Sequence, residues 1–88
     1  MREVTRTHQF KKDFKLAGKR GKKLQRLQVI IELLAKDEPL PARHRPHRLT
    51  GDMEGCWECH VEPDYLLVYE YLPGILMLVR FGTHSDLF

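Results

Sequence analysis

The stretch from Cys56 to His60 reads C-x-x-C-H, a spacing that could hold an iron or zinc centre. The same spacing is known from covalent haem attachment, and a cysteine pair two residues apart also suits zinc. Two more histidines, His44 and His47, lie shortly upstream and would complete a Cys2His2 set. Covalent haem attachment and zinc binding are therefore the first two functions that this stretch suggests.

The segment 56–61 has the composition of a β-strand, in which neighbouring side chains point to opposite faces of a sheet. One face would carry Cys56 and His60, and the other would carry Trp57 and Cys59. Haem attachment needs both thiols on one edge, and a zinc knuckle holds its cysteine pair in a tight turn. We therefore expect no cofactor or metal, with Cys59 as a core residue. A small zinc protein is the less favoured alternative.

Histidines, one carboxylate and an isolated arginine form a second set that could do chemistry, namely His47, His60, Asp64, Arg80 and His84. Arg80 interrupts the apolar run 75–81 and is the only Lys or Arg in residues 49–88. A guanidinium inside a strand must face water, a carboxylate or an anionic ligand. An ion pair with Glu58 or Glu70 is the simplest alternative to a ligand.

This set suits the cleavage of RNA, because RNA carries its own nucleophile, the 2′-OH. An enzyme must remove that proton, stabilise the charge on the phosphate and protonate the leaving 5′ oxygen. Histidine suits both proton transfers because its pKa lies near neutrality, and a fixed arginine supplies the electrostatic stabilisation. No metal is required. An aromatic ring such as Tyr65 or Phe88 could stack on a splayed base.

The elements that must position these residues begin with a short strand, because residues 2–6 alternate and are rich in β-branched types. Thr7 is a candidate N-cap for a first helix, and the glycines of segment 18–21 end that helix. Apolar residues at helical spacing predict a second helix over 24–34. The prolines in 37–41 terminate it.

Three strand-like runs follow, over 56–61, 65–72 and 75–81, and their short connections predict an antiparallel meander. A further short strand is expected near 47–50. The order predicts an α+β fold with an N-terminal strand, a two-helix hairpin on one face, and a meander sheet of three or four strands. We expect residues 1–88 to form a single domain.

Composition supports a folded protein, with 42% apolar and 31% charged residues in 88. No apolar run approaches a membrane span and no secretory signal is visible, so a cytoplasmic location is expected. Residues 1–48 hold 14 of the 15 Lys and Arg against five acids, a charge of +9. Residues 49–88 hold one Arg and seven acids, a charge of −6. The basic half suggests a polyanionic partner or, alternatively, a well-solvated helical surface.

The chain resembles the RelE superfamily of bacterial type II toxins, and within it the YafQ branch. The segments that carry the resemblance are FKKDFKLAGKRGK, PHRLTG, HVEPDYLLVYEY and FGTHSDLF, which span nearly the whole chain. The resemblance implies a compact α+β ribonuclease fold and metal-independent cleavage of mRNA, chiefly in the ribosomal A site, which inhibits translation. It also implies a cognate antitoxin, which together with the toxin binds operator DNA, and no contact with a membrane.

The family's functional positions fall on His47, His60, Asp64, Arg80, His84 and Phe88. The aromatic after the acid is Tyr65, where tryptophan is typical of the family. We hypothesise that Asp64 or His60 takes the 2′-OH proton and that His84 protonates the leaving oxygen.

Arg80 would stabilise the phosphate, while His47 and Phe88 would position the substrate. The basic helices would dock on ribosomal RNA through Lys11, Lys12, Lys15, Lys22 and Lys23. A non-catalytic RNA- or ribosome-binding module is the main alternative, because basic helices alone would suffice for binding. Cleavage of cellular mRNA would distinguish the two.

Overall fold

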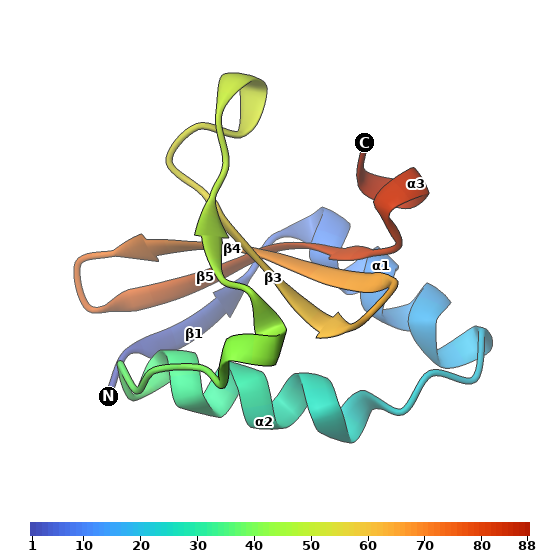
Figure 1. Ribbon diagram of the computed structural model, residues 1–88, viewed down its shortest axis with the longest axis horizontal. Helices are drawn as coiled ribbons and strands as arrows, with labels where there is room; N and C mark the ends of the chain where they lie inside the picture. The colour runs from blue at the N-terminus through green and yellow to red at the C-terminus, as the bar shows by residue number, and fades with distance from the viewer.

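The computed structural model describes residues 1–88, which form a five-stranded mixed sheet in the order β1-β5-β4-β3-β2 (Figure 1). The strands are β1 (Glu3–Arg6), β2 (His47–Arg48), β3 (Trp57–Glu62), β4 (Tyr65–Leu72) and β5 (Ile75–Gly82). The helices are α1 (His8–Lys19), α2 (Leu24–Ala35) and α3 (His84–Leu87), with 3₁₀ turns η1 (Ala42–His44) and η2 (Gly51–Met53). None of the helices has the length and hydrophobicity needed to cross a membrane.

The helix boundaries follow from local chemistry. The Thr7 side chain accepts a hydrogen bond from the Phe10 amide at 3.0 Å, which confirms the predicted N-cap of α1. After α1, Gly21 adopts a φ of +75°, a conformation that glycine reaches without strain. The short α3 was not predicted, although Thr83 caps it with a capping box to Asp86.

The meander of β3, β4 and β5 is antiparallel as predicted, and β2 adds a fourth antiparallel strand by pairing His47 with Glu58. The first strand, β1, pairs in parallel with the outer edge of β5, with Glu3 opposite Ile75. The sheet is therefore mixed. Both α1 and α2 lie between β1 and β2 in the chain and contribute to one core.

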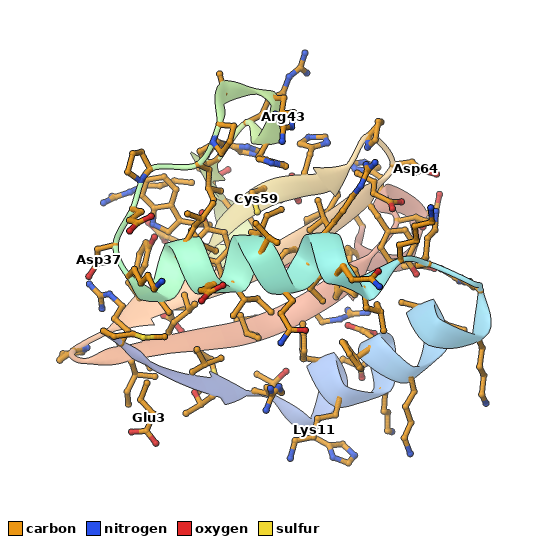
Figure 2. The ribbon with its side chains drawn as sticks, turned by 90° about the horizontal axis from the view of Figure 1, so that it is seen from below. Glu3, Lys11, Asp37, Arg43, Cys59 and Asp64 are labelled. Carbon is orange, nitrogen blue, oxygen red and sulfur yellow. The ribbon has the colours of Figure 1, made fainter.

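One face of the sheet packs under α1 and α2. Cys59, Leu67 and Phe81 lie opposite one another on β3, β4 and β5, and all three belong to the core. Figure 2 looks onto this side, with α2 crossing in front of the sheet near Cys59. Burial, with a smaller effect of the Glu58 charge, raises the pKa of the Cys59 thiol to about 12, so this thiol is a core residue, as predicted.

The opposite face carries α3, and we call it the α3 face. Figure 1 shows α2 on one side of the sheet, with α3 and the β2–β3 connection rising on the other side. Paired residues in antiparallel strands point to the same face, so the register places Glu58, Val68 and Arg80 together here. His60 and Gly82 follow in the next row.

Arg80 reaches the α3 face because of a β-bulge in β5. Tyr69 pairs with Leu78, whereas Val68 pairs with Arg80, so Val79 is an extra residue. Leu78 faces the helices, and simple alternation would send Arg80 to that same buried face. The bulge reverses the alternation and turns Arg80 to the α3 face, while Phe81 enters the core.

Deleting Val79 should remove the bulge and leave Arg80 on the α3 face. Arg80 would then follow Leu78 directly, so regular alternation still turns it away from the core and still sends Phe81 inward. We therefore expect the deletion to retain cooperative thermal unfolding measured by circular dichroism. Deleting Leu67, a buried residue of β4, is the control and should abolish it, because the deletion removes a core side chain and shifts the faces of its neighbours. Loss of cooperative unfolding in both variants would contradict the assignment of Val79 as the extra residue.

Candidate active site

The predicted site residues approach one end of the α3 face from several elements. His60 pairs with Leu66, and Leu66 pairs with Gly82, so the Cα atoms of His60 and Gly82 lie about 10 Å apart across two strand spacings. His84 starts α3 just beyond Gly82, and Asp64 lies in the turn between β3 and β4. The sequence predicted a common face, and the strand register is consistent with it.

Arg80 is held by a carboxylate from a distant helix. Its Nε lies 2.8 Å from Oδ2 of Asp13 and its Nη2 lies 3.3 Å from Oδ1. The ion pairs with Glu58 or Glu70, considered from the sequence, are therefore wrong. Three of the five guanidinium N–H donors remain for an anion, and the side chain is 26% exposed.

Asp13 is a buried carboxylate that also completes the edge of β5. Since β1 pairs with β5 only as far as Leu78, the Phe81 amide has no strand partner and donates instead to Asp13 Oδ2 at 3.0 Å. Gln9 donates to the other oxygen at 3.1 Å. Sequence analysis did not identify Asp13, although an acid three residues after Phe10 on a buried helix stripe was the available signal.

His47 forms a pair with a buried acid, Glu58, at a distance of 3.3 Å between Nε2 and Oε1. The other ring nitrogen, Nδ1, lies 2.9 Å from the carbonyl of Arg45. A carbonyl only accepts, so Nδ1 carries a hydrogen and Nε2 is directed at the carboxyl group. The second oxygen of Glu58 is buried without a hydrogen-bond partner. Glu58 thus orients His47, a role that the sequence did not suggest.

The ring of His60 is oriented by its own turn. Nδ1 lies 3.3 Å from the Pro63 carbonyl, so Nδ1 carries the hydrogen and Nε2 is left with a free lone pair. Asp64, by contrast, is 75% exposed and lies 3.9 Å from the Lys22 ammonium. His60 is therefore better arranged than Asp64 to accept a proton.

The short helix that carries His84 is anchored to the end of α1. Arg20 binds Asp86 through two contacts, Nη1 to Oδ2 at 2.7 Å and Nη2 to Oδ1 at 3.2 Å. These bonds from Arg20, with a backbone hydrogen bond from Thr83, hold the pKa of the Asp86 carboxyl well below its usual range. A Cβ on Gly82 would lie 2.9 Å from the Asp86 side chain, so this close approach favours glycine.

His84 is exposed, its ring has no hydrogen-bond partner, and the ring centre lies 5.3 Å from that of Phe88. Phe88 is 55% exposed, so its ring is available to a ligand. Tyr65 is not, since it is 1% exposed and its hydroxyl accepts a hydrogen bond from Arg20 at 3.1 Å. The stacking role suggested for Tyr65 is therefore wrong, because its ring is part of the core.

The basic surface predicted on the helices is largely free. Lys11, Lys12, Lys15 and Lys23 are exposed and have no ion-pair partner. Lys22 differs, because its ammonium lies 3.4 Å from Glu62 and 4.8 Å from the centre of the Tyr65 ring. Phe14, an aromatic residue of α1, is 39% exposed.

The residues weighed as zinc ligands do not come together. Cys59 is buried and Cys56 is partly exposed, while His44 donates to the His60 carbonyl and His47 lies against Glu58. No group of three or more His, Cys, Asp or Glu side chains is placed so that it could hold a metal ion.

Comparison with known proteins identifies the family of this chain. The family model for YafQ, described as the bacterial toxin of type II toxin–antitoxin systems, matches residues 2–88. This chain belongs to the YafQ toxin family. The mRNA interferase toxin YafQ of Escherichia coli K12 is 40% identical over 88 residues, which are 99% of this chain and 96% of that protein.

Two solved toxin structures share the whole fold. In the E. coli DinJ–YafQ complex, the matched chain has a TM-score of 0.92 and 39% identity, with 100% of this chain and 99% of that chain covered. A metal-bound toxin from Helicobacter pylori has a TM-score of 0.95 and 38% identity, with full coverage of both chains. The fold predicted from the sequence, with its strand, two helices and meander, is confirmed.

Replacing Asp13 should lower the free energy of unfolding, and the loss should depend on whether the new side chain keeps an acceptor oxygen. In Asp13→Ala, both Arg80 and the Phe81 amide lose their acceptor, and we expect a loss of about 3–5 kcal/mol in the free energy of unfolding. Asp13→Asn keeps one acceptor oxygen, so about 1–3 kcal/mol is expected. Urea unfolding at neutral pH measures both, with the exposed Glu38→Ala as control. Losses no larger than in the control would contradict the role of Asp13.

The Arg20–Asp86 pair should make the free energy of unfolding depend on pH in the acid range. Because the folded-state pKa of Asp86 is lowered from an unfolded value near 3.8, its stabilising contribution is present above that value and is lost as the pH falls below it. The difference in unfolding free energy between the wild type and Asp86→Asn should therefore shrink below about pH 4. Asp52→Asn, at an exposed position without an ion-pair partner, should show no such trend. A constant difference for Asp86→Asn would argue against the pair.

Proposed function

We propose that this chain is the toxin of a type II toxin–antitoxin system and inhibits translation as an endoribonuclease that cleaves mRNA in the ribosomal A site. Membership of the YafQ family supports the toxin role, and the E. coli relative carries the name mRNA interferase. The observation that carries the catalytic proposal is the reversed alternation at Val79, which turns Arg80 to the face where His60 lies.

The reaction needs three groups at one phosphate. His60 Nε2 accepts the 2′-OH proton, since Nδ1 is engaged with the Pro63 carbonyl. The 2′ oxygen then bonds to phosphorus, the bond to the 5′ oxygen breaks, and a protonated His84 gives its proton to that leaving oxygen. The products are a 2′,3′-cyclic phosphate and a free 5′-hydroxyl. Each positioned acid or base contributes roughly 10²- to 10⁴-fold.

Arg80 stabilises the charge that develops on the phosphate oxygens. Asp13 fixes the guanidinium through Nε and Nη2, so Nη1 and the outer N–H of Nη2 are free to meet the phosphate. A lysine at this position would have three N–H donors on a single nitrogen and would lack the planar fork that lets Arg80 hold Asp13 with one edge and meet the phosphate with the other. No step in this scheme passes through a bound metal.

His47 and Phe88 position the substrate. The buried Glu58 fixes the ring of His47 on the row that contains Arg80, so His47 can contact the phosphate or ribose beside the cleaved bond. The exposed ring of Phe88 lies beside His84 and offers a surface for a base.

The proposed macromolecular partners are ribosomal RNA and an antitoxin. The exposed lysines of α1 and the α1–α2 connection are the proposed contacts to ribosomal RNA, whereas Lys22 is engaged with Glu62 and contributes less. A cognate antitoxin is expected to block the chain, as the DinJ–YafQ complex suggests, and to recruit it to operator DNA. This activity places the chain in the cytoplasm with the ribosome.

Primer extension on cellular mRNA after induction of the chain tests the proposal. The wild type should give cuts in register with codons, and His60→Ala and His84→Ala should each reduce cleavage at least about 10²-fold while the fold is retained. His8→Ala removes an exposed histidine outside the site and should cut like the wild type.

Two outcomes would contradict the catalytic assignment. If both site variants cut like His8→Ala, these histidines are not the catalytic groups. If growth stops while the messages stay intact, the chain is a non-catalytic module that acts by occupying the ribosome. Circular dichroism of each purified variant verifies that a loss of cutting does not come from unfolding.

A further inference from the structure

A second basic region lies away from the lysine surface, in a groove of about 790 Å³ between α2, η1 and β3. Its polar lining residues are Arg26, Arg43, His44, Arg45, His60 and Glu62. In Figure 2, Arg43 projects from η1 on the opposite side of α2 from Lys11. The groove is thus distinct from the proposed ribosome contact.

The guanidinium groups of this groove have no partner within the protein. Arg2, Arg20 and Arg80 each form an ion pair, whereas none of the three groove guanidinium groups donates to a protein acceptor. The only acid in the lining is Glu62, and it is already bound to Lys22 at 3.4 Å. The groove therefore carries a concentrated positive charge that no side chain of this chain neutralises.

The backbone holds these charges in place. The edge of β3 beyond β2 has no strand partner, and the His44 ring donates from Nδ1 to the His60 carbonyl at 2.6 Å, which ties η1 to β3. Arg45 then adopts a left-handed conformation with a φ of +45°, unusual for a residue with a side chain. The backbone that carries Arg43 and Arg45 is thus held next to His60.

We infer that this groove binds the phosphates of the RNA strand next to the cleaved linkage. The inference rests on the proposed function, because His60 lines the groove and also supplies the proposed base. A strand whose scissile phosphate lies at Arg80 can continue past His60 into the groove. Guanidinium groups suit this ligand, since their planar fork binds two phosphate oxygens at once.

The competing occupant is an acidic segment of the antitoxin. RNA is favoured because the groove is continuous with the proposed catalytic residue and because only three of its ten lining residues are hydrophobic, Val29, Ile30 and Val61. A folded peptide segment would bury a larger apolar surface than these side chains offer. A phosphate backbone needs charge and little apolar surface.

Binding of an oligoribonucleotide that is 2′-O-methylated at every position separates binding from cleavage, because the attacking hydroxyl is blocked. The test variant is Arg43→Gln/Arg45→Gln, and the control Arg6→Gln/Lys36→Gln removes the same charge from exposed positions outside the groove and outside the proposed ribosome contact. Loss of two phosphate contacts should weaken binding about 25-fold at 0.1 M salt and lower the salt slope by about 1.4. The control should change both much less.

Equal losses in the two double variants, no loss in either, or no RNA binding by the wild type would each overturn the inference. Weaker binding of purified antitoxin with unchanged RNA binding would assign the groove to the protein partner instead. If the groove binds RNA as expected while the wild type leaves cellular mRNA intact, the groove stands and the proposed cleavage fails. If the wild type cleaves cellular mRNA while the groove does not bind RNA, the proposed cleavage stands and the inference about the groove fails.

Discussion

The feature on which the rest of the structure depends most is the arrangement of the C-terminal end of β5. A single extra residue, Val79, reverses the alternation of the strand, and Asp13 from α1 then binds both the Phe81 amide and the Arg80 guanidinium. If Val79 took an ordinary paired position in the strand, Arg80 would point into the core. Without Asp13, the end of β5 would have an unpaired amide and an unpaired charge. One carboxylate therefore joins the helical layer, the sheet edge and the proposed phosphate site.

The remaining site residues are placed by contacts of the same local kind. Backbone carbonyls fix the Nδ1 atoms of His47 and His60. Nε2 of His47 lies against Glu58, whereas Nε2 of His60 is left free to act. The helix that carries His84 is secured from outside by the Arg20–Asp86 pair. The His84 ring makes no hydrogen bond within the protein, which suits a group that must pick up and release a proton. The strands thus support a site whose proposed acid has no competing hydrogen bond.

The sequence predicts the fold where the signal is local and misses it where the signal is distant. Helical spacing, the Thr7 cap and the short turns gave the element order, and strand alternation placed Cys59 in the core. Strand alternation does not predict that Val79 is an extra residue, because one inserted residue leaves no mark in the composition. The sequence alone also does not show that Tyr65 points into the core, that β1 pairs in parallel, or that Asp13 reaches Arg80 across 67 positions.

The most direct measurement is a structure of the chain bound to RNA that carries a 2′-deoxy sugar at the cleaved nucleotide, which leaves the phosphate in place without its nucleophile. A phosphate oxygen should lie within hydrogen-bond distance of Arg80 Nη1 while Nε stays on Asp13, with His60 Nε2 facing the 2′ carbon and His84 near the 5′ oxygen. An RNA phosphate held away from Arg80, or an Arg80 that leaves Asp13 to reach it, would contradict the central role of this contact.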